Sequence, residues 1–81
     1  MARKFSSYTD GRYIYEIKEV VPKTWYIAAY LVQGGRKGNV HRLLGRTDAK
    51  CITRDHWTSK YMAQTKLELA ALQKGWKEWG T

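Results

Sequence analysis

The chain has 81 residues, 43% of them hydrophobic and 14% aromatic, which suits one compact domain over residues 1–81 and excludes a disordered tail. Fifteen Lys and Arg against seven Asp and Glu leave a formal charge of +8, so the expected partner is a polyanion. Nucleic acid is favoured over an acidic protein or an anionic membrane surface. The remaining alternative is a basic protein that binds no polyanion. A single cysteine, Cys51, excludes an internal disulfide, and the lack of a signal segment or membrane-length apolar run predicts a cytoplasmic protein without a membrane partner.

The first predicted strand follows a polar segment. Residues 1–9, which include Arg3 and Lys4, are expected to form a flexible basic arm, and residues 10–11 mark a turn. In residues 13–21 apolar and polar side chains alternate, which predicts a half-buried strand with Arg12 at its start.

Residues 25–32 predict the central strand, because they are rich in β-formers and apolar on both faces. One of these faces is expected to meet the core. The other carries Tyr26 and Tyr30 and is expected to form an exposed aromatic platform.

A glycine-rich hairpin loop is predicted over residues 33–39, with two cations at its tip, Arg36 and Lys37. The third strand is predicted over residues 40–46, where Arg42 and Arg46 share a face. A register slip of one residue would turn both arginines to the core side, so two orientations stay open.

Residues 47–57 allow a short fourth strand or an irregular approach to a helix. The helix is expected to begin near Thr58 or Ser59, either of which can cap its first turn; a cap at Thr53 would give a longer helix. Gly75 suits the position after its last residue. The stripe expected to pack on the sheet consists of Tyr61, Met62, Thr65, Leu69 and Leu72.

Trp76 and Trp79 close the chain and allow two interpretations. They either fold back over the helix end and enlarge the core, or form an apolar patch for a protein partner.

These elements predict an α+β fold, in which a three-stranded antiparallel sheet packs against one C-terminal α-helix and leaves its other face open. On that face, cations that reach phosphates and tyrosines that stack on bases would bind nucleic acid; the alternative is that the arginines only solvate the face. The residues assigned to this interface are Arg3, Lys4, Arg12, Tyr26, Tyr30, Arg36, Lys37, Arg42 and Arg46.

Catalysis finds little support in the sequence. His41, His56 and Cys51 match no zinc-ligand spacing, and the glycine-rich loop lacks the spacing of a phosphate-binding loop. We therefore expect a protein that is not an enzyme and that holds neither a metal nor a cofactor.

The order of parts resembles the N-terminal arm-binding domain of tyrosine-recombinase integrases. The likeness covers residues 10–74 and consists of Asp10-Gly11-Arg12-Tyr13-Ile14-Tyr15 opening the first strand, Trp25-Tyr26 opening the second, and Thr58-Ser59-Lys60 leading into the helix. It implies a sheet that enters the DNA major groove, and an accessory protein or isolated domain from a phage or mobile element. The step over residues 47–57 is longer than in that family, and we expect a domain without the recombinase catalytic part.

Three functions are therefore compared. Binding of double-stranded DNA by the open sheet face is favoured. The alternatives are RNA binding through the same surface, and a small phage-encoded interaction module or inhibitor that docks on a host protein through Trp76 and Trp79.

Overall fold

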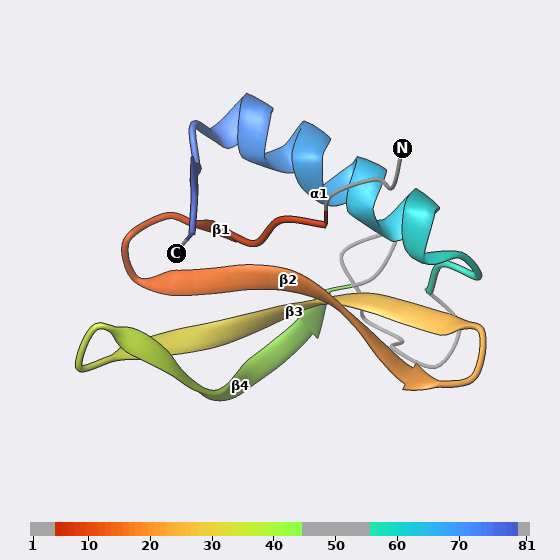
Figure 1. Cartoon of the computed structure of the whole chain (residues 1–81), viewed down its shortest axis with the longest axis horizontal. Coiled ribbons are helices and arrows are strands. Elements are labelled where there is room, and N and C mark those ends of the chain that lie inside the picture. Colours follow the sequence, from red (N-terminus) through yellow and green to blue (C-terminus); the bar gives the residue numbers. More distant parts are fainter. Residues whose placement is uncertain (1–4, 45–55, 80–81) are drawn as a thin grey trace.

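The computed structural model describes residues 5–44 and 56–79, which form one helix packed on an antiparallel sheet (Figure 1). The α+β class and the antiparallel sheet are confirmed, but the sheet has five strands in the order β4-β3-β2-β1-β5, not three. The elements are β1 (Tyr8–Thr9), β2 (Tyr13–Val21), β3 (Thr24–Gln33), β4 (Arg36–Leu44), α1 (Lys60–Lys74) and β5 (Lys77–Glu78).

The two additional strands extend the sheet beyond β2. β1 pairs with β2, and β5 pairs with the other edge of β1; the Trp79 N–H then donates to the Ser7 carbonyl at 2.8 Å. Residues 1–9 are thus not a flexible arm throughout, because Tyr8–Thr9 is a strand and the half-buried Tyr8 packs against the core. Arg3 and Lys4 lie outside the described residues.

A two-residue turn joins β3 and β4 in place of the predicted seven-residue loop. Gly34 and Gly35 have φ angles of 60° and 76°, and Gln33 is paired with Arg36 directly across them. Positive φ at both turn positions gives the backbone twist that suits a tight hairpin. β4 therefore begins at Arg36 and not at Val40.

This turn supplies a prediction about stability. Gly34→Val is expected to lower the free energy of unfolding by about 1–2 kcal/mol, because a β-branched residue fits poorly at positive φ, whereas Gly34→Asn should be nearly neutral. Urea unfolding of the two variants measures the difference. Equal losses in both would contradict this account of the turn.

The ends of α1 follow their predicted signals. Ser59 is the N-cap, and its hydroxyl accepts from the Tyr61 N–H at 3.2 Å; Gly75 ends the helix in the left-handed region at φ 73°. Because α1 begins at Lys60, the longer helix capped at Thr53 is excluded.

The prediction of which face of α1 packs on the sheet is wrong. The buried residues are Ala63, Gln64, Leu67 and Ala71. Leu72, expected in the core, is 81% exposed. The physical reason is that large aromatic side chains outside the helix, among them Tyr15, Trp57 and Trp76, fill much of the space beneath it, so two of the four buried positions of α1 are alanines.

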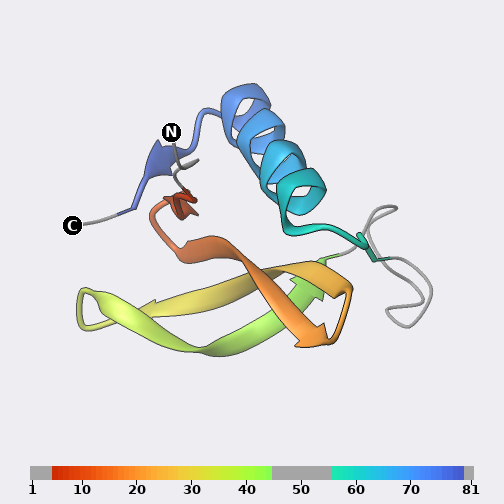
Figure 2. The ribbon, with the colours of Figure 1, turned by 45° about the vertical axis from the view of Figure 1, so that its right-hand side comes forward.

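Helix α1 covers one face of the twisted sheet, and no helix covers the other face among the described residues (Figure 2). Under α1, Tyr15, Ile27 and Ala29 form a core with Trp57 and Leu67. A second cluster on the other face contains Ile14, Ala28 and Tyr30, with Val32, Leu43 and Trp79 against it. In addition, Trp57 is bound to the edge of β3 by two backbone hydrogen bonds with Trp25, of 2.8 and 3.0 Å.

Candidate nucleic-acid interface

Tyr13, His41 and Arg42 meet at the end of the sheet where β2 begins. The rings of Tyr13 and His41 lie 5.0 Å apart at 31°. Together with Arg42 they border a hollow of about 230 Å³, whose full lining is Tyr13, Tyr15, Ala29, His41 and Arg42. His41 and Arg42 are exposed, so a ligand could reach them from solvent.

A bulge in β4 brings His41 and Arg42 to the same hollow. Ala29 pairs with Arg42 but the next residue of β3, Tyr30, pairs with Val40, so His41 is the extra residue. Such a bulge bends a strand and redirects side chains. Because Ala29 belongs to the core under α1, Arg42 lies on the helix side of the sheet. The hypothesis that Arg42 shares the open face with the tyrosines is therefore wrong.

Arg36 lies on the same face as Arg42. Their partners in β3 are Gln33 and Ala29, which are four residues apart and therefore point to one side. At ~3.3 Å per residue, the two arginines are about 13 Å apart along the sheet.

The turn before β2 fixes the position of Arg12 and Tyr13. Asp10 Oδ1 accepts from the backbone N–H of Arg12 at 2.9 Å and of Tyr13 at 2.8 Å. The Arg12 guanidinium lies 5.4 Å from the centre of the Tyr13 ring. We call the surface formed by Arg12, Tyr13, Arg36, His41 and Arg42 the arginine surface.

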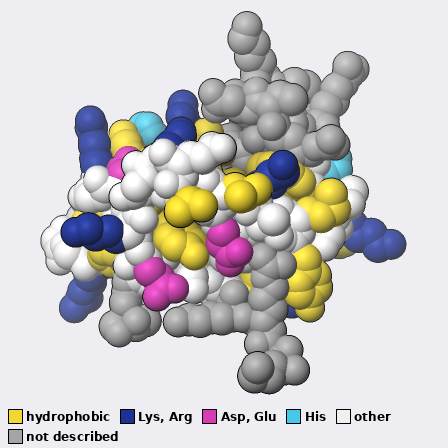
Figure 3. Space-filling model, turned by 90° about the horizontal axis from the view of Figure 1, so that it is seen from above, with side chains coloured by type: hydrophobic (Ala, Val, Ile, Leu, Met, Phe, Trp, Pro, Cys, Tyr) yellow, Lys and Arg dark blue, Asp and Glu magenta, His cyan; other side chains and the backbone are white. Residues whose placement is uncertain are grey.

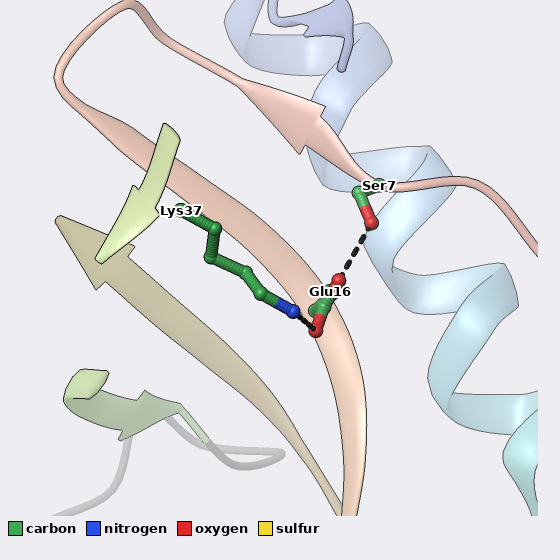
Figure 4. A network of polar contacts seen from close by, with 3 residues as sticks. All are labelled: Ser7, Glu16 and Lys37. Carbon is green, nitrogen blue, oxygen red and sulfur yellow. Dashed lines mark hydrogen bonds and ion pairs between the residues drawn. The ribbon is translucent and has the colours of Figure 1, made fainter. Parts of the chain in front are cut away.

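The three arginines of this surface, Arg12, Arg36 and Arg42, have no ion-pair partner within the described part of the chain. Lys37 differs, because its Nζ lies 2.7 Å from Glu16 Oε1 (Figure 4). The hydrogen bond to Glu16 raises the pKa of Lys37, although partial burial opposes this.

Lys37 therefore belongs to a network within the protein. Glu16 Oε2 accepts from the Ser7 hydroxyl at 2.9 Å, and Lys37 Nζ lies 4.6 Å from the centre of the Tyr30 ring. A cation held in this way has less free charge to offer a phosphate than Arg36 beside it.

The predicted aromatic platform does not exist, because Tyr26 is 2% and Tyr30 8% exposed. Tyr30 packs against Ile14 and Ala28, and the ring of Tyr26 lies 6.2 Å from that of His56. Neither ring can stack on a base without rearrangement. Tyr13 was not predicted as a site residue; its pairing with His41 depends on the bulge in β4, which has no signal in the sequence.

The C-terminal tryptophans belong to the packed interior. The Trp76 ring stacks on Tyr15 at 3.9 Å and 1°, and half-buried Trp79 packs against the second cluster. Of the two interpretations, enlargement of the core agrees with this geometry, although both side chains stay partly exposed. Arg46 and Cys51 lie outside the described residues.

The Tyr15 phenol links the turn before β2 to the core. Its hydroxyl donates to Asp10 Oδ2 at 3.0 Å. Burial, this hydrogen bond and the negative charge of Asp10 together raise the pKa of Tyr15 to about 12. Burial alone would raise the pKa of Asp10, but the hydrogen bonds from Tyr13, Arg12 and Tyr15 outweigh it and lower that pKa.

The raised pKa of Tyr15 predicts a loss of stability in alkali. The unfolded chain loses this proton near pH ~10, so the contribution is complete below that pH and is lost as the pH rises through about 12. In Tyr15→Phe the free energy of unfolding should fall less steeply above pH ~10 than in the wild type. Urea unfolding across that range gives both slopes, and identical slopes would contradict the assignment.

Among the described residues, no group of three or more His, Cys, Asp or Glu side chains could hold a metal ion. Within the same ranges, no helix combines the length and apolar character needed to cross a bilayer. A comparison with protein-family models, curated proteins and solved structures finds no significant match. The geometry of the arginine surface is therefore the basis for a functional proposal.

Proposed function

We propose that this chain is a nucleic-acid-binding module that contacts double-stranded DNA through the arginine surface. The observation that carries the proposal is the pair Arg36 and Arg42, which share one face and have no carboxylate partner among the described residues. Their spacing of about 13 Å is close to the ~12 Å width of the major groove of B-DNA. The net charge of +8 adds a long-range attraction for any polyanion.

The chemistry of the arginine surface suits contacts with phosphates and base edges. Arginine binds phosphate or guanine through two parallel hydrogen bonds, and His41 adds a polar ring at the hollow. Base stacking has less support, because Tyr26 and Tyr30 are buried. Double-stranded DNA is therefore favoured over single-stranded nucleic acid, which relies on stacking.

The resemblance to integrase arm-binding domains supports the same ligand but implies a different surface. In that family the open sheet face enters the groove, whereas Arg36 and Arg42 lie on the helix side of this sheet. A role in a phage or mobile element, which the resemblance implies, is part of the proposal.

Fluorescence anisotropy with a labelled duplex tests this function. Binding is expected at about 50 mM salt and should weaken strongly at about 200 mM, with a slope of about −0.9 in log affinity against log salt for each phosphate contacted. Unlabelled duplex RNA and single-stranded DNA serve as competitors. Absence of duplex binding at the lower salt concentration would refute the proposal, and stronger competition by RNA would move the assignment to RNA.

A further inference from the structure

Helix α1 presents large apolar side chains to solvent on the side away from the sheet. The exposed fractions are 50% for Met62, 46% for Leu69 and 81% for Leu72. Tyr61 and Phe5, whose rings lie 5.4 Å apart, are also exposed near the start of α1. Figure 3 views this side and shows hydrophobic side chains across its middle. Single exposed leucines are ordinary, but a contiguous apolar patch marks an interaction surface.

These side chains have the spacing of a helix–helix seam. Met62, Thr65, Leu69 and Leu72 follow one another at intervals of three, four and three residues, which is the a/d pattern of a heptad repeat. From Met62 to Leu72 this seam is about 15 Å long at 1.5 Å per residue. We call these four residues the outer stripe. Its form is a line on one helix, which suits another helix laid along it.

One lysine and one glutamate flank the outer stripe. Lys66 is exposed one position after Thr65, on the side of the stripe away from Glu68. Glu68, on the opposite flank, accepts a hydrogen bond from Gln64 Nε2 at 3.1 Å. An acidic flank on the partner would therefore complement the Lys66 side.

A second copy of the chain fits this surface poorly. In an antiparallel pair centred on the stripe, Lys66 would face Lys66 and Glu68 would face Glu68, because both lie within a residue of the centre. Like charges in such positions are destabilising, and two bodies of net charge +8 repel each other in any arrangement.

A lipid surface also fits poorly. A bilayer is flat, so it would contact the whole outer side of α1 and not only the outer stripe. On that side, acidic side chains lie next to the hydrophobic ones (Figure 3). Anionic lipids repel carboxylates. A helix laid along the stripe on the Lys66 flank avoids them.

We propose that the outer stripe of α1 binds an amphipathic α-helix of another protein, which has an apolar seam and an acidic flank. Met62, Leu69 and Leu72 supply the apolar contact, and Lys66 selects the acidic flank. The outer stripe and the arginine surface share no residue, so this interaction is independent of the proposed DNA binding.

A designed peptide provides a direct probe. It is a three-heptad helix, about 21 residues long, with Leu at the a and d positions and Glu on the one flank that meets Lys66; one control peptide has Ser at a and d, and another has Lys on that flank. Isothermal titration calorimetry with the full chain should show binding of the first peptide that exceeds that of either control at least tenfold. The Ser control separates specific binding from general attraction to a basic protein.

Variants of the chain then locate the site. Leu69→Ser with Leu72→Ser should weaken binding at least tenfold, while the matched exposed pair Val20→Thr with Val21→Thr on β2 should change it less than twofold. Lys66→Glu should weaken binding of the Glu-flanked peptide and strengthen that of the Lys-flanked one. Circular dichroism confirms that each variant is folded, which is expected because the replaced side chains are exposed.

Four outcomes would overturn the proposal. These are failure of the Glu-flanked peptide to bind, equal binding by the Leu69→Ser, Leu72→Ser variant, dimerisation of the chain that depends on Leu72, and stripe-dependent capture by phosphatidylglycerol vesicles. The last two would assign the surface to a second copy or to lipid. None of them bears on duplex binding by the arginine surface.

Discussion

Leu67→Ala is expected to lower the free energy of unfolding by about 2–5 kcal/mol, the range for deletion of a fully buried leucine side chain. Leu67 is 0% exposed and packs with Tyr15, Ile27 and Trp57. A domain of this size has a stability of only about 5–10 kcal/mol, so we expect the variant to lose much of its folded population at 37 °C. Urea unfolding followed by tryptophan fluorescence measures the loss.

The matched control is Leu72→Ala, which makes the same chemical change on the other side of α1. Leu72 is 81% exposed, so its replacement should alter stability by no more than about 0.5 kcal/mol. If α1 packed on the sheet through the stripe predicted from the sequence, which contains Leu72, then Leu72→Ala would cause the large loss of stability and Leu67→Ala the small one. A large loss for Leu72→Ala with a small one for Leu67→Ala would therefore refute the orientation of α1.

The helix shows what periodicity can and cannot predict. Its existence and both ends followed from local signals, since Ser59 and Gly75 act within one turn of the backbone. Its packed face did not, because α1 has two apolar sides, one with Met62 and Leu69 and one with Ala63 and Leu67. Only the aromatic residues beneath the helix, contributed by distant segments, decide that the side with the alanines faces inward.

Of the long strands, β2 and β3 were predictable to within a residue or two. Alternation identified β2, and a run of β-formers that is apolar on both faces identified β3. β1 and β5 have two residues each, too few for any alternation to be recognised, and they pair with each other across the length of the chain.

The candidate site was predictable in part. Arg36 and Lys37 lie directly after the β3–β4 turn, close to where the sequence places them, but the face reached by Arg42 depends on the register and the bulge opposite Tyr30. The pairing of Lys37 with Glu16, 21 residues away, and the burial of Tyr26 are tertiary effects that no local pattern contains.

Removing both arginines of the shared face should produce the largest functional effect. Arg36→Ala with Arg42→Ala is expected to weaken duplex binding about 100-fold at 50 mM salt, because each phosphate contact contributes on the order of tenfold at that concentration. The salt slope should also fall by about 1.8 if both side chains contact phosphate. Anisotropy titrations at several salt concentrations yield the affinity and the slope together.

Net charge alone would also weaken binding, so the control removes the same two charges elsewhere. Lys18 lies on the opposite sheet face, in register with Tyr26, and Lys66 lies on the outer side of α1; both are exposed. Lys18→Ala with Lys66→Ala should weaken binding less than about threefold and leave the slope nearly unchanged, since distant charges are screened within ~10 Å at 0.1 M salt. Equal losses in the two double variants would mean that the chain attracts DNA only through its overall charge, and the arginine surface would lose its role.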